Sequence, residues 1–471
     1  KLGQYAYEVW DSKLSKQPKP EYIIQLCCYA EMLSDIQGQL PRYMTVASSD
    51  GEQHTFKVTD YYYYYQAIKS EFLQVQQSFD PQLMIDPADS KTFGRWSNYA
   101  AMLLKQADHL SLIANISSSQ IQKLNRAGIH TVDELIHSEQ SKVAGLRTEQ
   151  FNKLKQQAAI QKRSNDQIPP LYELLPGTPN VIGLSMMPPH SENDLFFDIE
   201  GYPLIDGGLE YLWGITYFDN NGNRAFRAYW AHDAREEKQA FEAFIEWVYH
   251  RWLNDPSMHI YHYAQYEVVA CKRLMGRYGV CEDKVDQLLR NNVFIDLYTI
   301  VRNAFRIGEP KYSIKNVEHL YRGKRETDVG TGGDSVVVYD NWRNQPDGTD
   351  WQCSEILNSI REYNIDDCNS TQELAQWLRN EQLANHIAYV GEQPIVEVEL
   401  KEEQQQRQLF RDQLLFKASQ LSGLDASILE NLAWMLDFHT REAKPIFWRK
   451  FERLALDEEE LYDDIDCLAY C

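Results

Sequence analysis

The chain lacks any apolar run that approaches the ~18 residues needed to cross a lipid bilayer. It also lacks a Gly-x-x-x-x-Gly-Lys-Ser/Thr sequence, the phosphate-binding loop of nucleotide-driven motors. Its eight cysteines are scattered, and the adjacent pair Cys27 and Cys28 is not spaced like metal ligands. These absences argue against a membrane protein, a zinc ribbon, a disulfide framework and a motor domain. They favour reduced thiols and a cytoplasmic location.

Positive charge is also scarce, because 47 Lys and Arg face 69 Asp and Glu, for a net charge of -22. This balance argues against nonspecific wrapping of nucleic acid, although local basic patches can still bind phosphates. The length of 471 residues predicts about three domains at ~150 residues each. Since the chain opens on Lys1 rather than Met, we expect it to be a piece of a longer protein.

Two carboxylates interrupt an apolar stretch at residues 195–201. Side chains alternate along a strand, so Asp198 and Glu200 are predicted to share one face. Two buried carboxylates repel each other unless a cation lies between them, and oxygen ligands suit Mg²⁺ or Mn²⁺. The alternative is an exposed edge strand that carries two solvated acids.

The surrounding pattern, over residues 192–383, predicts three strands, a helix, a short strand and a helix that carries Glu267 near its start. A glycine-rich stretch at 330–333 is expected to be a loop. The last predicted helix places Tyr363 and Asp367 four residues apart on one face. Asp366 is the competing candidate for the acid on this helix, and Asp296, after a further strand, is expected to be structural.

In this order, the motifs resemble the DEDD 3′–5′ exonucleases, in the subgroup with a tyrosine in the last motif, and the bacterial YprB-type proteins. The resemblance implies a central RNase-H-like mixed sheet flanked by helices. It implies that two Mg²⁺ or Mn²⁺ ions, about 3.5–4 Å apart, activate water and neutralise the leaving oxygen. Tyr363 would aim the attacking water. The implied metal ligands are Asp198, Glu200, Glu267 and Asp367.

Residues 1–85 carry a second acidic motif. Asp11 and Lys13 share a predicted strand face, and Gln25 and Tyr29 lie one turn apart on the next helix. This pattern resembles the RecB-like branch of the PD-(D/E)xK nucleases. The acid that precedes this motif in that family has no Asp counterpart among the ten residues before Asp11, so the segment is half an active site. The alternative is a structural remnant or a truncated domain.

Residues 86–165 predict a small helical module with two capping boxes, Ser117-x-x-Gln120 and Thr131-x-x-Glu134. The tight link between them contains Gly128 and resembles a helix-hairpin-helix, which binds DNA phosphates through backbone amides. His130 replaces the second glycine of that motif. Four residues are candidates for nucleic-acid contact besides Gly128, with solvated helix faces as the alternative: Lys123, Arg126, Lys272 and Arg273.

The chain is thus expected to be an α/β multidomain protein. A proline-marked linker, 166–191, precedes the central domain, and a helical connector with an acidic tail, 384–471, follows it. This domain order resembles that of large bacterial proteins in which a RecB-like nuclease, a helix-hairpin-helix and an RNase-H-like nuclease precede a superfamily 1 helicase. The resemblance implies a fused or associated helicase as partner.

The resemblance implies a 3′–5′ exonuclease that acts on single-stranded DNA, with RNA as a possible substrate because no motif reports contacts to the 2′-hydroxyl. Two alternatives stay open. In the first, the nuclease folds serve as a catalytically silent DNA-binding scaffold for the helicase. In the second, the main activity lies in a RecB-like domain that is completed upstream.

Overall fold

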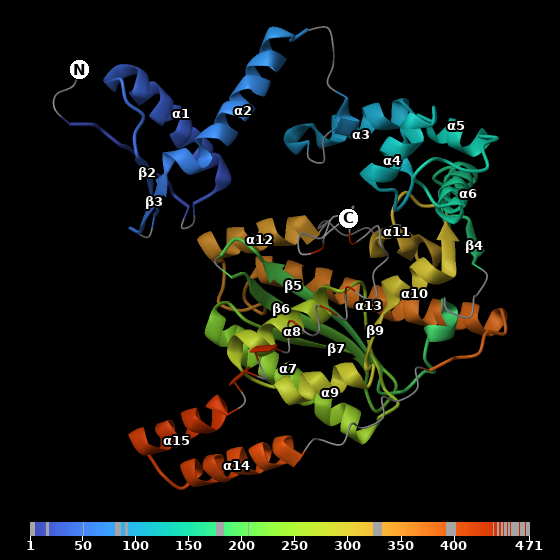
Figure 1. The fold of residues 1–471 in the computed structure, drawn as a ribbon. Helices are drawn as coiled ribbons and strands as arrows, with labels where there is room; N and C mark the ends of the chain where they lie inside the picture. The colour runs from blue at the N-terminus through green and yellow to red at the C-terminus, as the bar shows by residue number, and fades with distance from the viewer. Residues whose placement is uncertain are drawn as a thin grey trace. The chain divides into compact units, whose positions relative to one another are not determined.

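The computed structural model divides the chain into two compact units, residues 1–94 and 95–471 (Figure 1). In the described residues, no helix combines the length and apolarity that a bilayer crossing requires. The structure describes residues 5–15, 18–49, 51–80, 86–89, 93–175, 183–205, 207–323, 332–391 and 402–436, with isolated positions from 438 to 467.

The first unit contains a three-stranded sheet in the order β1-β2-β3. β1 (Val9–Ser12) runs parallel to β2 (Tyr43–Ala47), and β2 runs antiparallel to β3 (Gln53–Lys57). α1 (Pro20–Gln37) begins with a proline, whose missing N–H costs nothing in the first helical turn. It packs against α2 (Val58–Gln77) and the sheet around a small apolar core that includes Leu26, Cys27, Met44, Val46 and Val58.

The second unit begins with short helices. They are η2 (Gly94–Trp96), α3 (Ser97–Gln106), η3 (Leu110–Leu112), α4 (Ser118–Arg126), α5 (Val132–His137) and α6 (Thr148–Ser164). Both predicted capping boxes are formed, at the start of α4 and at the start of α5. Gly128, between these helices, has φ of +81°, a conformation that a glycine adopts without steric cost.

The segment 166–191, expected to be a linker, contributes structure of its own. Its strand β4 (Tyr172–Leu174) pairs antiparallel with β10 (Phe305–Ile307) of the central domain. In addition, the Gln157 side chain of α6 donates a 2.8 Å hydrogen bond to the carbonyl of Ile307. The segment and the helical module therefore both pack on the central domain at β10, the first through strand pairing and the second through a side-chain hydrogen bond.

The central domain contains a five-stranded mixed sheet in the order β7-β6-β5-β8-β9. β5 pairs antiparallel with β6, and β6 with β7, whereas β5-β8 and β8-β9 are parallel pairs. The mixed sheet agrees with the expected fold class. The strands are β5 (Leu195–Tyr202), β6 (Leu209–Phe218), β7 (Arg224–Trp230), β8 (Ile260–His262) and β9 (Phe294–Asp296).

Helices cover both faces of this sheet (Figure 1). Phe197 and Ile199 of β5 lie in one core with α7 (Ala234–Asn254), α8 (Tyr266–Tyr278) and α9 (Glu282–Arg290). Phe196 belongs instead to a second core, with α10 (Leu297–Ala304) and α13 (Glu355–Ala384). Because side chains alternate along β5, this division turns the even-numbered positions of the strand toward α13.

A helix begins inside the stretch 330–333 that was expected to be a loop, so the expectation was wrong for Gly332 and Gly333. α12 (Gly332–Asn344) begins at Gly332, while residues 324–331 lie outside the described residues. The ring of Tyr339 stacks on that of Tyr211 at a centroid distance of 3.7 Å, and this buried contact fixes α12 against the sheet.

The remaining elements are short or C-terminal: η1 (Pro87–Asp89), η4 (Leu184–Met186), α11 (Ile314–Val317), η5 (Glu318–Leu320), α14 (Glu402–Ser419) and α15 (Leu424–Met435). α14 and α15 lie in the segment after residue 384. The predicted acidic tail lies outside the described residues.

Candidate active site

A cluster of carboxylates lies where β5 meets α13. Asp198 and Glu200 share the face of β5 that is turned toward α13, and Asp367 projects from that helix. One carboxylate oxygen from each of the three lies within 4.8 Å of the other two. Among the described residues, these three form the one group of at least three acidic, histidine or cysteine side chains that lie close enough together to hold a metal ion.

The cluster is electrostatically unfavourable without a cation. Burial, followed by the charges of Asp367 and Glu200, raises the pKa of Asp198 well above its usual value. Burial also raises the pKa of Glu200 to about 8. Carboxylates that are both desolvated and mutually repelling favour a bound cation, which restores their charged form.

Glu267 is the fourth metal ligand that the resemblance implies, in the second acidic motif along the chain. It lies beside this cluster in the first turn of α8. It is buried, and its charge contributes to the raised pKa of Asp198. Its Oε2 atom is buried without a hydrogen-bond partner and lies 3.6 Å from the Nδ1 of His262. An orphaned carboxylate oxygen at the edge of an acidic cluster suits a divalent metal site.

Two acids near the predicted site residues, Asp296 and Asp366, bond to groups outside the cluster. Asp296 accepts hydrogen bonds from the amides of Ala264, at 2.8 Å, and Tyr298, at 2.9 Å, so it is structural as expected. Asp366, the competitor of Asp367, accepts a 2.8 Å bond from Arg322. Of these two neighbouring acids on α13, it is therefore Asp367 that joins the cluster.

Tyr363 is buried on α13, one turn before Asp367. Burial and then the charge of Asp367 raise the pKa of the Tyr363 phenol, so the hydroxyl keeps its proton and is available as a hydrogen-bond donor. The ammonium of Lys315 lies 4.9 Å from the centroid of this ring.

Two residues that orient the acids were not found from the sequence. The Asn364 amide donates a 2.7 Å hydrogen bond to Asp198, and the Ser335 hydroxyl donates a 2.7 Å bond to Glu200. Gly214, inside a strand of large residues, is a sequence signal for Asn364, since glycine in a strand often marks a close approach. Ser335 lies 135 positions from Glu200, on a helix that the sequence did not predict.

The structure also brings together the four residues of the RecB-like motif in the first unit. The Nζ of Lys13 lies 2.9 Å from Asp11 and donates a 2.6 Å bond to Gln25, which in turn donates a 2.7 Å bond to Tyr29. Among the described residues, no second acid joins this group closely enough to complete a three-ligand metal site.

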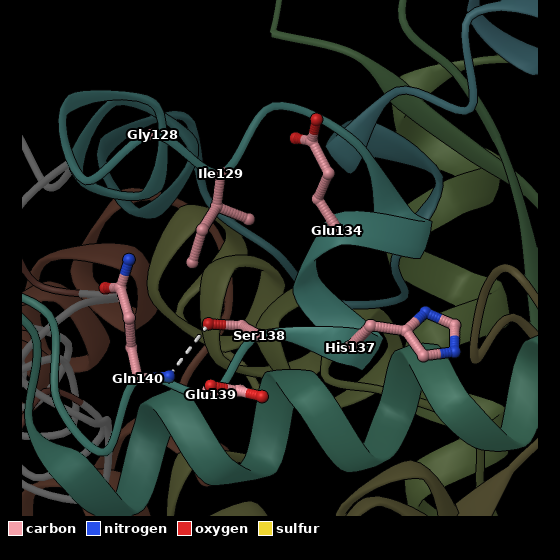
Figure 2. Close-up of a pocket in the computed structure, with 7 residues that line it drawn as sticks. All are labelled: Gly128, Ile129, Glu134, His137, Ser138, Glu139 and Gln140. Atoms are coloured by element: carbon pink, nitrogen blue, oxygen red, sulfur yellow. Dashed lines mark hydrogen bonds between the residues drawn. The ribbon is translucent and has the colours of Figure 1, made fainter.

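The hairpin around Gly128 borders a pocket of about 600 Å³, in which Glu134 and Glu139 are acidic (Figure 2). Glu134 accepts hydrogen bonds from the amides of His130, at 2.7 Å, and Thr131, at 3.2 Å. Each amide from residue 128 to residue 134 donates a hydrogen bond within the protein. A phosphate must therefore displace Glu134 before it can bind the amides of His130 and Thr131, and the phosphate-binding role of Gly128 stays a prediction.

The predicted basic contacts are in varied settings. Arg126 is exposed, and the stem of Lys123 packs beside Gly145. On α8, Arg273 pairs with Glu210 and donates a 3.1 Å bond to the carbonyl of Gly207, and Lys272 is half-buried. The Arg273 guanidinium thus already has protein partners.

In a comparison with known protein families, one family model matches part of this chain. Residues 195–379, which contain the whole carboxylate cluster, match the model of the RNase_H superfamily. No curated protein and no solved structure matches the chain significantly. Residues 195–379 of this chain are therefore an RNase_H superfamily domain, whose buried acidic triad fits a metal-dependent nuclease.

Proposed function

We propose that this chain is a 3′–5′ exonuclease that hydrolyses phosphodiester bonds of single-stranded DNA at the Asp198 cluster. The observation that carries the proposal is the convergence of Asp198, Glu200 and Asp367 within 4.8 Å inside an RNase_H superfamily domain. The polarity and the DNA preference follow from the resemblance to the DEDD exonucleases. From the resemblance of the domain order to large helicase-fused bacterial proteins, we propose a fused or associated superfamily 1 helicase as partner, and from the scattered cysteines a cytoplasmic location.

The site residues divide the chemical work. Asp198, Glu200, Glu267 and Asp367 would hold two Mg²⁺ or Mn²⁺ ions, which supply a water of lowered pKa and neutralise charge on the leaving oxygen. Tyr363 keeps its phenol proton and donates it as a hydrogen bond that aims the attacking water.

Two neighbours hold the acids in place. Asn364 and Ser335 each donate one hydrogen bond, to Asp198 and to Glu200 respectively, so the carboxylates are oriented before substrate arrives. An enzyme that pre-orders its charged groups in this way avoids reorganising them in the transition state.

Two rival functions predict different behaviour. A silent scaffold would bind nucleic acid and leave it intact, yet all four predicted carboxylates are present in the central domain. A nuclease centred on the first unit is favoured by the bonded group of Asp11, Lys13, Gln25 and Tyr29. That rival requires cleavage to depend on Lys13 and not on Asp198.

The test is degradation of single-stranded DNA and RNA oligonucleotides that carry a label at either the 5′ or the 3′ end, with Mn²⁺, Mg²⁺ or EDTA. We expect metal-dependent shortening from the 3′ end of DNA that the Asp198→Ala and Asp367→Ala variants both abolish. Binding without cleavage by the wild type would support the scaffold. Internal cuts or shortening from the 5′ end would contradict the exonuclease polarity, and faster decay of RNA would contradict the preference for DNA.

A further inference from the structure

A lysine, Lys315, lies at the edge of the carboxylate cluster. Its Nζ is 4.9 Å from the ring centroid of Tyr363, on which the attacking water is proposed to depend. Its positive charge also acts on Glu200, where it opposes the rise in pKa that burial causes. The ammonium group thus lies near both the proposed water-positioning phenol and one of the proposed metal ligands.

The segment that carries Lys315 is held in place on both sides. Upstream, the hydroxyl of Tyr263 donates a hydrogen bond to the carbonyl of Tyr312, and Tyr263 lies four positions before Glu267. Two residues that follow Lys315 bond to Glu309, which precedes it. The Nδ2 of Asn316 lies 2.7 Å from one carboxylate oxygen of Glu309, and the Nδ1 of His319 lies 2.9 Å from the other. The Tyr263 bond thus ties the segment just before α11 to the loop that precedes Glu267, and the Glu309 contacts hold α11 against the chain before it.

Charge balance gives this lysine a function. Four carboxylates and two divalent cations cancel, so the phosphodiester brings a negative charge that the metal site alone leaves uncompensated. That charge grows as the attacking oxygen bonds to phosphorus. A fixed cation at the edge of the site therefore stabilises the transition state more than the ground state.

We propose that Lys315 is a catalytic residue that contacts the scissile phosphate and donates a hydrogen bond to a non-bridging oxygen. The proposal rests on the proposed function of the cluster. The oxygen of water forms a bond to phosphorus and gives up a proton to solvent, the bond from phosphorus to the 3′ oxygen breaks, and solvent protonates that leaving oxygen. Lys315 transfers no proton in this step, and it acts through its charge and the hydrogen bond that it donates.

Single-turnover cleavage of a 3′-terminal nucleotide in saturating Mn²⁺ tests this role. We expect Lys315→Gln to lower kcat by about 100-fold or more, as removal of one transition-state donor does elsewhere, with a smaller change in KM. Lys315→Arg keeps the charge and should recover part of the rate. Lys311→Gln, an exposed lysine in the same loop, is the matched control and should match the wild type.

Two further measurements separate a catalytic role from a structural one. The affinity for Mn²⁺, measured by calorimetry, should not fall in Lys315→Gln, since that variant removes a positive charge beside Glu200, and the melting temperature should stay near that of the wild type. A kcat like that of the wild type, or a loss fully explained by weaker Mn²⁺ binding or by unfolding, would overturn the role of Lys315 alone. A wild type that binds Mn²⁺ but cleaves nothing would overturn the proposed function and this inference with it.

Discussion

The side-chain amide of Asn364 donates a 2.7 Å hydrogen bond to Asp198 and thereby joins α13 to β5 inside the carboxylate cluster. Asn364 follows Tyr363 directly in the chain and is fully buried. The bond favours the charged form of Asp198, against the burial and the neighbouring acids that raise the pKa of that carboxyl. A residue with no direct part in the chemistry therefore orients Asp198 and favours its charged form.

Removal of this bond should weaken the metal site. We expect Asn364→Ala to lower Mn²⁺ affinity or cleavage by roughly 10- to 100-fold, the usual cost of losing a partner that orients a metal ligand. Asn380→Ala, at an exposed position of the same helix, is the control. Calorimetry and cleavage rates that are the same in both variants would show that Asp198 needs no such support.

Gly214 leaves the space that Asn364 occupies. A Cβ atom at position 214 would lie 1.6 Å from the Oδ1 of Asn364 and 2.9 Å from the ring of Phe226. We expect Gly214→Ala to destabilise the domain by about 1–3 kcal/mol, as overpacking does, and to displace Asn364 from Asp198. Urea denaturation measures this. Gly323→Ala, where no described atom lies within 4 Å of the added carbon, should leave stability nearly unchanged.

The raised pKa of Glu200 makes the metal-free protein sensitive to pH. Between its ordinary value of 4.5 and about 8, the folded protein holds the Glu200 proton more tightly than the unfolded chain. The free energy of unfolding in EDTA should therefore fall as pH rises through this window, and Glu200→Gln should flatten the fall. Melting temperatures from pH 5 to 9 measure it, with the exposed Glu192→Gln as control. If the melting temperatures of the wild type, Glu200→Gln and Glu192→Gln change with pH in the same way, the pKa of Glu200 is not raised in the folded protein.

The motif in the first unit should not contribute to cleavage by this chain. Lys13 is bonded to Asp11 and Gln25, and among the described residues no further acid completes a metal site around them. We expect Lys13→Ala to cleave oligonucleotides at the rate of the wild type. Loss of cleavage in Lys13→Ala, together with an active Asp198→Asn variant, would move the catalytic centre to the first unit.

The sequence predicts the acids well because their spacing is local. Alternation along one strand pairs Asp198 with Glu200, and one helical turn pairs Tyr363 with Asp367. Both capping boxes are likewise set by residues within about four positions of one another. The mixed sheet joins strands that lie far apart in the chain and was expected only from the resemblance to the DEDD exonucleases.

Features that depend on distant residues could not be predicted. Ser335 reaches Glu200 only because α12 packs on the sheet through the stacked rings of Tyr339 and Tyr211. The strand β4 forms only because β10, more than a hundred positions away, offers a partner. Prolines and glycines near both segments indicate loops, and tertiary packing overrides that local preference.

The decisive comparison is the rate of Mn²⁺-dependent release of the 3′-terminal nucleotide by the wild type and by Asp198→Asn. Asparagine keeps the size of the side chain and removes the negative charge that Asp198 would offer to a cation. We expect a loss of at least about 1,000-fold with an unchanged fold, together with no cleavage by the wild type in EDTA. An Asp198→Asn variant that cleaves at the rate of the wild type would contradict it.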